Sequence, residues 1–323
     1  MNNTRVLLAS RPVGLPTRDN WTIETVPVQQ PGEGEFLAEV RYISLDPAMR
    51  GWINEGKSYI DPVGIGDVMR AGGVGRVVES NNPSFAVGDH VLGISGVQSH
   101  WLSDGKGVRK VDPGMAPLPK FLGVLGMPGM TAYFGILDVG AIKEGEIVLV
   151  SGAAGAVGSL VGQIAKIQGC RVVGIAGGKD KCDYLTGELG FDAAIDYKSE
   201  ALMPALKAAC PKGIDVYFDN VGGETLDAAL AFLRFKGRVA LCGAISQYNS
   251  TAPIKGPENY LSLLINRGRM EGFIVFDFEK EFPRFFRDMG QWLAEGKLQS
   301  REHIVKGIET FPDTLLMLFD GRN

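Results

Sequence analysis

Three glycines spaced three residues apart lie within the segment Gly152–Gly158, where they could bring the backbone close to a phosphate group. An unbroken apolar run, Ile147–Val150, precedes them and is typical of a parallel strand that is buried on both faces. Residues Ser159–Gln168 then follow a helical pattern. In a strand, turn and helix of this order, backbone N–H groups and the positive end of the helix face a pyrophosphate. The glycines alone predict only a tight turn, but a second apolar run, Arg171–Ile175, follows at once and favours a dinucleotide site.

The residues after this second strand indicate which dinucleotide fits. An NAD site usually has an acidic side chain here, which binds the ribose 2′-OH. In the segment Ala176–Cys182, Asp180 lies between Lys179 and Lys181 and follows two glycines. A 2′-phosphate needs cationic and backbone donors, and a carboxylate would repel it. We therefore predict NADP(H), although an exposed lysine pair on a first helical turn would have the same sequence.

The histidines and cysteines predict that the chain has no metal site. A catalytic zinc ion generally needs three protein ligands from His, Cys or carboxylate side chains. The first 145 residues contain only His90 and His100 and no cysteine, and the third histidine is His303. The cysteines have no C-x-x-C spacing and are expected to be reduced in a cytoplasmic chain. They are Cys170, Cys182, Cys210 and Cys242.

The composition is that of an ordinary globular protein, with 45% hydrophobic and 22% charged residues in a chain of 323. This length allows two domains, each with its own core. No apolar run approaches the roughly 20 residues of a membrane span. The N-terminus lacks the apolar segment of a signal peptide, so we expect a cytoplasmic protein without a membrane partner. The net charge of −4, without a basic stripe, argues against a nucleic-acid partner.

The front half of the chain predicts a compact β domain, because short apolar segments alternate with Gly, Pro, Asn and Asp turns. The predicted strands are Val6–Ala9, Ile23–Pro27, Phe36–Ser44, Gly73–Val78, His90–Ile94 and Gly107–Val111. Strands at this spacing predict a small barrel or a partly closed sheet. A long aromatic connection, residues 45–60, carries Trp52 and Tyr59. Such a connection is often functional, but the two rings could equally be packed into the β domain.

The back half repeats strand and helix six times, which matches a doubly wound parallel sheet. The strands are centred near Ile147, Val172, Ala194, Val216, Val239 and Phe273. Ligands of such sheets bind at the carboxyl ends of the strands. After a helix at Phe278–Glu295 we predict a strand at His303–Ile308 and a helix at Pro312–Phe319, which return to the first domain. The expected division is residues 1–125, residues 126–299 and a return segment, 300–323.

Six motifs together resemble those of a known family. They are Ser44–Gly51, Gly126–Tyr133, Ala153–Gly158, Leu189–Asp192, Phe218–Gly223 and Cys242–Asn249. Over nearly the whole chain their order is similar to that of the zinc-independent medium-chain dehydrogenases/reductases of the leukotriene B4 12-hydroxydehydrogenase, or prostaglandin reductase, group. That group also contains alkenal double-bond reductases and bacterial curcumin-reductase-like enzymes. The resemblance implies a GroES-like β-barrel domain, a doubly wound parallel-sheet (Rossmann) domain, a homodimer, and NADPH-dependent reduction of the C=C bond in α,β-unsaturated ketones or aldehydes.

The resemblance also implies roles for individual residues. Lys181 and Tyr197 would bind the 2′-phosphate. The other cofactor contacts that it implies are Thr131, Gly155, Ala156, Val157, Gly158, Asn220, Cys242, Gly243, Ala244, Ile245, Ser246, Tyr248, Phe273, Ile274, Val275 and Asn323. The chain departs from the family pattern in two places. It ends at Asn323, where family chains usually continue, and Ala48 stands where plant members often have a pocket tyrosine, so their substrate range is not implied.

Two tyrosines are candidate catalytic residues. Hydride addition to the β-carbon of an enone leaves negative charge on the carbonyl oxygen, and without a metal a hydroxyl or an amide must stabilise it. Tyr248, in a loop at the carboxyl end of the fifth strand, is the first candidate, and Tyr59 is the second. Tyr248 could instead only anchor the ribose or cap its loop. Two other functions remain open at this point: a quinone reductase of the same superfamily, and an NADPH-binding module without turnover.

Overall fold

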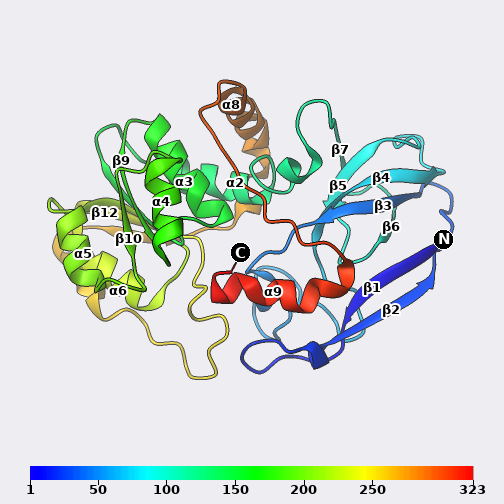
Figure 1. The fold of residues 1–323 in the computed structure, drawn as a ribbon, viewed down its shortest axis with the longest axis horizontal. Coiled ribbons are helices and arrows are strands. Elements are labelled where there is room, and N and C mark those ends of the chain that lie inside the picture. The colour runs from blue at the N-terminus through cyan, green and yellow to red at the C-terminus, as the bar shows by residue number, and fades with distance from the viewer. Residues whose placement is uncertain (323) are drawn as a thin grey trace. The chain divides into compact units, whose positions relative to one another are not determined.

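A computed structural model describes residues 1–322 of the chain. They form two compact units: residues 123–301 form one, and the described residues on both sides of that segment form the other. The first contains a parallel sheet covered by helices, whereas the flanking unit contains antiparallel strands (Figure 1).

The flanking unit has two antiparallel sheets. The larger has the strand order β6-β3-β4-β5-β7, and the smaller pairs β1 with β2. The strands are β1 (Asn2–Leu8), β2 (Trp21–Pro27), β3 (Phe36–Ile43), β4 (Gly72–Ser80), β5 (His90–Ile94), β6 (His100–Ser103) and β7 (Arg109–Val111). The sequence pattern predicts all of them except β6, a strand of four residues.

Helices from distant parts of the chain share the core of this unit. They are α1 (Met49–Trp52) and α9 (Phe311–Asp320). Phe311 is buried in the same apolar cluster as Val6 and Trp21. Its ring meets that of Trp21 edge-on, with 5.0 Å between the ring centroids. The last helix of the chain therefore packs against the hairpin of β1 and β2.

The strand predicted at His303–Ile308 is wrong. Residues 301–307 have no regular secondary structure, and a single 3₁₀ turn follows at Ile308–Thr310. Gly307 has a φ of 95°, which turns the backbone away from the extended conformation. Ile304 and Val305 are exposed, so their apolar character reflects no buried strand face.

Residues 123–301 form a six-stranded parallel sheet with the order β10-β9-β8-β11-β12-β13. Its strands are β8 (Ile147–Ser151), β9 (Arg171–Ala176), β10 (Ala193–Asp196), β11 (Ile214–Asp219), β12 (Leu233–Leu241) and β13 (Arg269–Gly272). The connecting helices include α2 (Met127–Phe134), α3 (Ala156–Ile167), α4 (Lys179–Gly187), α5 (Leu202–Ala209), α6 (Gly223–Ala231), α7 (Leu261–Asn266) and α8 (Phe282–Ala294). The predicted doubly wound sheet is confirmed. Its strand order reverses between β8 and β11, whose carboxyl ends flank the point where such sheets bind ligands.

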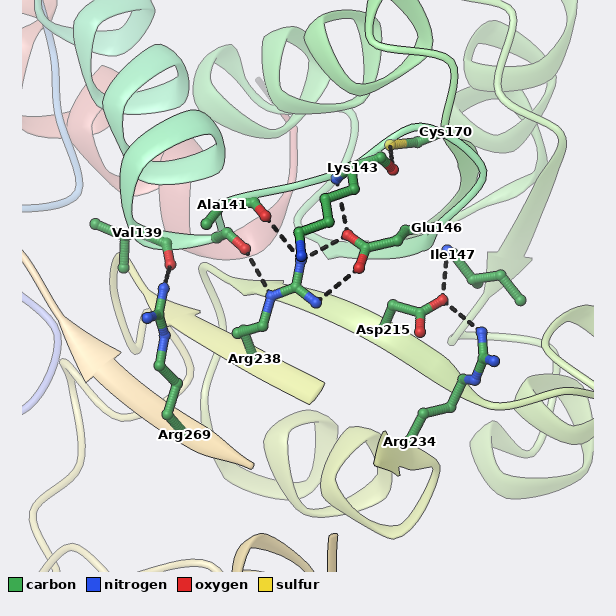
Figure 2. Close-up of polar contacts among 11 residues, drawn as sticks. Val139, Ala141, Lys143, Glu146, Ile147, Cys170, Asp215, Arg234, Arg238 and Arg269 are labelled. Atoms are coloured by element: carbon green, nitrogen blue, oxygen red, sulfur yellow. Dashed lines mark hydrogen bonds and ion pairs between the residues drawn. The ribbon is translucent and has the colours of Figure 1, made fainter. Parts of the chain in front are cut away.

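Ion pairs and a hydrogen bond join three of these strands near the amino-terminal edge of the sheet, opposite the carboxyl ends (Figure 2). Arg238 of β12 donates to both carboxylate oxygens of Glu146, and its Nη1 lies 2.9 Å from Oε1. Asp215 of β11 accepts the N–H of Ile147 at 2.9 Å and a guanidinium N–H of Arg234 at 2.7 Å. Side chains thus join β8, β11 and β12 at one end, and loops join them at the other.

Candidate dinucleotide-binding site

The turn between β8 and α3 brings a helix end to the point where the strand order reverses. Gly152 has a φ of 57°, a left-handed conformation that glycine adopts without strain. A Cβ on Gly158 would lie 2.4 Å from the carbonyl oxygen of Gly152, so only glycine lets the helix begin this close to the strand. The N-cap is Gly155, which has no side chain to bind the first N–H groups of the helix, those of Ala156, Val157 and Gly158. These N–H groups fit a phosphate.

The turn between β9 and α4 is shaped by Tyr197 and Asp196. A Cβ on Gly177 would lie 2.9 Å from ring atoms of Tyr197, so the ring lies directly against the backbone of the turn. The Gly178 N–H donates to Oδ1 of Asp196 at 2.7 Å, and the Lys198 N–H donates to the same oxygen at 3.0 Å. Hydrogen bonds from the Gly178 N–H, the Ser199 hydroxyl and the Lys198 N–H hold the pKa of Asp196 below its ordinary value. This carboxylate therefore joins the turn after β9 to the loop that follows β10.

The two lysines of α4 have different environments. The ammonium group of Lys179 pairs with Asp183 on the helix surface, and its side chain is 81% exposed. Lys181 is half-buried, and Tyr197 is exposed with its ring against the turn. Asp180 is exposed. Of these side chains, Lys181 and Tyr197 carry donor groups beside the turn, and such donors are what a 2′-phosphate needs.

Asn220 joins the ends of β8 and β11. Its Nδ2 donates to the carbonyl oxygen of Ser151 at 2.7 Å, and its backbone N–H donates to Ser151 Oγ at 3.0 Å. Asn220 thus also has a structural contact that the sequence does not reveal. Ser151 and Asp219, both buried, receive no role from the sequence, because one polar side chain at the end of an apolar strand forms no pattern.

The loop after β12 folds Tyr248 back onto its own backbone. The phenol oxygen of Tyr248 accepts a hydrogen bond from the N–H of Ala244 at 3.2 Å. A Cβ on Gly243 would lie 2.8 Å from that oxygen, so glycine at this position permits the contact. Ser246 Oγ donates to the carbonyl oxygen of Val221 at 2.6 Å, which joins this loop to the one after β11. A phenol that accepts a hydrogen bond is a stronger donor through its own O–H.

The segment after β13 packs its aromatic side chain into the core. The Phe273 ring meets Phe218 edge-on, with 6.1 Å between the ring centroids, and the missing Cβ of Gly135 leaves room for it. Val275 is buried as well. Ile274 and Thr131, the latter on α2, are half-buried. The predicted contacts in this segment therefore include side chains whose first role is packing.

Tyr59 belongs to the other unit. Its hydroxyl oxygen accepts the indole N–H of Trp52 at 2.9 Å, and its side chain is otherwise exposed. The guanidinium of Arg70 lies 5.9 Å from the centroid of the Trp52 ring. Asn323, the last predicted cofactor contact, lies outside the described residues.

Among residues 1–322, no group of three or more His, Cys, Asp or Glu side chains is arranged to hold a metal ion. The four cysteines are free thiols. Burial raises the pKa of the Cys242 thiol to about 12, so this side chain stays neutral. No helix in the described part of the chain is long and apolar enough to cross a membrane.

Comparison with known proteins defines the class. Residues 4–111 match a family described as the N-terminal domain of oxidoreductase, and residues 156–292 match one described as zinc-binding dehydrogenase. NADPH-dependent curcumin reductase of Escherichia coli is 46% identical over 99% of this chain and 94% of its own length. The NADP(+)-dependent 2-alkenal reductase of Nicotiana tabacum is 41% identical over 100% of this chain and 96% of its own. The crystal structure of CurA from Vibrio vulnificus in complex with NADPH has a TM-score of 0.95 at 46% identity, covering 99% of this chain and 96% of that one.

These likenesses extend over both units of the chain, and they define a two-domain oxidoreductase. The chain belongs to the zinc-independent medium-chain dehydrogenases/reductases, in the group of the prostaglandin, curcumin and alkenal double-bond reductases. The resemblance read from the six sequence motifs is confirmed.

Proposed function

We propose that this protein is an NADPH-dependent reductase of the C=C bond in α,β-unsaturated ketones and aldehydes. The observation that carries the proposal is an identity of 41–46% over nearly the full chain to reductases whose names specify NADP(H) and either curcumin or a 2-alkenal as substrate. The carboxyl edge of the parallel sheet supports it, because it offers a helix N-terminus and cationic donors to a phosphorylated dinucleotide.

The cofactor is held by residues of the parallel-sheet unit. The first N–H groups of α3 bind the pyrophosphate, and Lys181 and Tyr197 bind the 2′-phosphate. The loops that begin at Asn220 and Cys242 and the segment Phe273–Val275 line the nicotinamide half. What supports this assignment is that every one of these segments lies at or just beyond the carboxyl end of a strand or in the first turn of a helix.

The reaction needs a hydride, a proton and stabilisation of one oxygen. NADPH, when bound, supplies the hydride that adds to the β-carbon of the substrate. Tyr248 donates its O–H to the carbonyl oxygen as negative charge develops there, and the Ala244 N–H that this phenol accepts strengthens it as a donor. The α-carbon then takes a proton from Tyr248 or from water. Tyr59, held by Trp52, is the second candidate for the donor.

We also propose a homodimer in the cytoplasm. β13 ends the described sheet, so one of its edges is free for another strand. Beside it in the sequence, α7 leaves Leu261, Leu264 and Ile265 more than half exposed. Apolar side chains next to an open sheet edge favour association with a second copy. The free thiols favour a reducing compartment.

Activity with two substrate classes tests the proposed function. Purified protein and NADPH are given either an α,β-unsaturated carbonyl compound, such as a 2-alkenal or a curcuminoid, or a quinone, and NADPH oxidation is followed. We expect efficient turnover of the unsaturated carbonyl compound to the saturated one. Turnover of quinones alone would assign the chain to quinone reduction, and NADPH binding without turnover of either class would leave only a binding module.

A further inference from the structure

Asp219 lies at the carboxyl end of β11 and is fully buried. Its Oδ1 accepts the N–H groups of Val221 and Gly222, both at 2.9 Å. The hydroxyl of Tyr217 donates to the same oxygen at 2.7 Å, and that of Ser151 at 3.1 Å. Burial holds the pKa of Tyr217 well above its ordinary value, so its hydroxyl remains a donor.

The same residue connects the loops of three strands. Ser151 ends β8, and its Oγ also accepts the N–H of Asn220. The carbonyl oxygen of Asp219 accepts the N–H of Cys242 at 2.9 Å and that of Gly243 at 3.1 Å, where the chain leaves β12. The ends of β8, β11 and β12 are therefore all bonded to this one residue.

Stability alone does not account for a carboxylate at this place. Its other oxygen, Oδ2, is buried and has no hydrogen-bond partner in the described part of the chain. A buried polar atom without a partner is destabilising, and an apolar side chain of similar size would avoid that cost. What an apolar side chain could not do is hold two successive backbone N–H groups in a fixed turn.

We infer that Asp219 is a positioning residue of the cofactor site. Its hydrogen bonds fix the backbone conformation of Asn220–Gly222 and of Cys242–Gly243. The identity of the ligand, NADPH, rests on the proposed function. Misplacement of a binding group by about 1 Å can cost roughly 100-fold in an enzyme's performance. Loss of the Asp219 contacts should therefore lower the affinity for NADPH, although this side chain is buried beneath the loops and does not touch the cofactor.

Two variants of Asp219 and one control test the inference. Asp219→Ala removes the acceptor, and Asp219→Asn keeps an oxygen that can accept the same donors. Leu206→Ala is the control for lost stability, because Leu206 is fully buried on α5 and belongs to an apolar cluster on the same sheet. NADPH affinity is measured by titration at a temperature where all variants are folded. Hydrogen exchange of the amides of both loops is measured without cofactor.

We expect Asp219→Ala to weaken NADPH binding by about tenfold or more. Exchange should speed up most in the loop after β11, which loses the carboxylate acceptor, and less in the loop after β12, whose N–H groups bond to the backbone carbonyl oxygen that Ala retains. Asp219→Asn should retain most of the NADPH affinity and most of the protection from exchange. Leu206→Ala should change neither quantity. Equal NADPH affinity in Asp219→Ala and the wild type, or an equal loss in Leu206→Ala, would overturn the inference. If Asp219→Ala does not fold, Ser151→Ala, which removes one donor to Asp219 and the acceptor of the Asn220 N–H, takes its place with the same criteria.

The NADPH titration and the hydrogen-exchange measurement together distinguish this inference from the proposed function. A wild-type protein that does not bind NADPH would contradict the proposed function, while the exchange measurement would still decide whether Asp219 orders the loops. A wild-type protein that binds NADPH, together with an Asp219→Ala variant that binds it equally well, would contradict the positioning role alone.

Discussion

Lys181 and Lys179 are two residues apart in α4, and we propose that only Lys181 discriminates between the cofactors. Lys179 is largely exposed and paired with Asp183, whereas Lys181 is half-buried next to the turn after β9. Lys181→Ala should weaken NADPH binding by about 1.5–3 kcal/mol, or roughly ten- to a hundredfold, and leave NADH binding nearly unchanged. Lys179→Ala is the matched control and should change neither. Equal affinities for NADPH and NADH in the wild type would contradict this assignment.

Tyr248→Phe separates the two roles that this hydroxyl can have. If the hydroxyl stabilises the enolate oxygen, the chemical rate falls by about 10²–10³ while NADPH affinity is retained. If it anchors the ribose, NADPH binding weakens by about 0.5–1.5 kcal/mol instead. Single-turnover rates at saturating NADPH and an independent binding titration measure the two quantities. Tyr59→Phe serves as the comparison, and a rate loss found there but not in Tyr248→Phe would move the donor to Tyr59.

We expect Asp46 to make the free energy of unfolding depend on pH. It is buried, its Oδ2 has no hydrogen-bond partner among the described residues, and burial raises its pKa from 3.8 to about 6. Because the folded state holds this proton more tightly than the unfolded state, the free energy of unfolding falls as the pH rises from about 4 to about 6. The loss amounts to about 3 kcal/mol and persists above that range.

Asp46→Asn should abolish this dependence and make the protein more stable near neutral pH. Urea unfolding at about pH 4 and about pH 7 measures it, and Asp180→Asn, a change at an exposed aspartate, is the control. The same pH dependence in Asp46→Asn and the wild type would show that other groups cause it.

At the scale of the elements, the turn between β8 and α3 decides whether the helix end can face a phosphate. Gly158→Ala places a methyl group 2.4 Å from the Gly152 carbonyl oxygen, so helix and strand must separate. We expect a loss of stability of about 1–3 kcal/mol, typical of overpacking, together with weaker NADPH binding. Gly290→Ala, on α8 with open space around its Cβ, should be neutral or stabilising by up to about 1 kcal/mol. Thermal unfolding and NADPH titration of both variants check this, and unchanged binding in Gly158→Ala would contradict it.

Helices and strands could be predicted wherever an apolar pattern repeats along the sequence. The contacts between the ends of these elements could not. Apolar runs such as Ile147–Val150 specify buried parallel strands, and their alternation with helices specifies the sheet. The His303–Ile308 segment has strand-like residues, but a strand needs a partner edge, which a local pattern does not encode. Asp219 and Ser151 were assigned no role for a similar reason, because Ser151 donates to Asp219 from 68 residues away, and the N–H groups of Cys242 and Gly243 that bond to Asp219 are also distant in the sequence.

At the scale of the whole molecule, the open edge of β13 and the apolar side chains of α7 predict a dimer. Leu264 is 75% exposed, and Leu264→Asp should shift the protein from dimer to monomer with little change in unfolding temperature. Met115→Asp, at a residue 78% exposed in the other unit, is the control and should leave the dimer intact. Light scattering during size-exclusion chromatography measures both. A wild-type monomer, or a dimer that survives in Leu264→Asp, would contradict the proposed interface.

The central claim, hydride transfer to a C=C bond, is tested most directly by isotope labelling. The protein is incubated with an enone and NADPH that carries deuterium at C4 of the nicotinamide, on the face used for transfer, and the product is analysed by NMR. We expect a saturated ketone or aldehyde with deuterium on the former β-carbon and a solvent-derived hydrogen on the α-carbon. Deuterium on the carbonyl carbon of an unsaturated alcohol, or a product without deuterium, would contradict it.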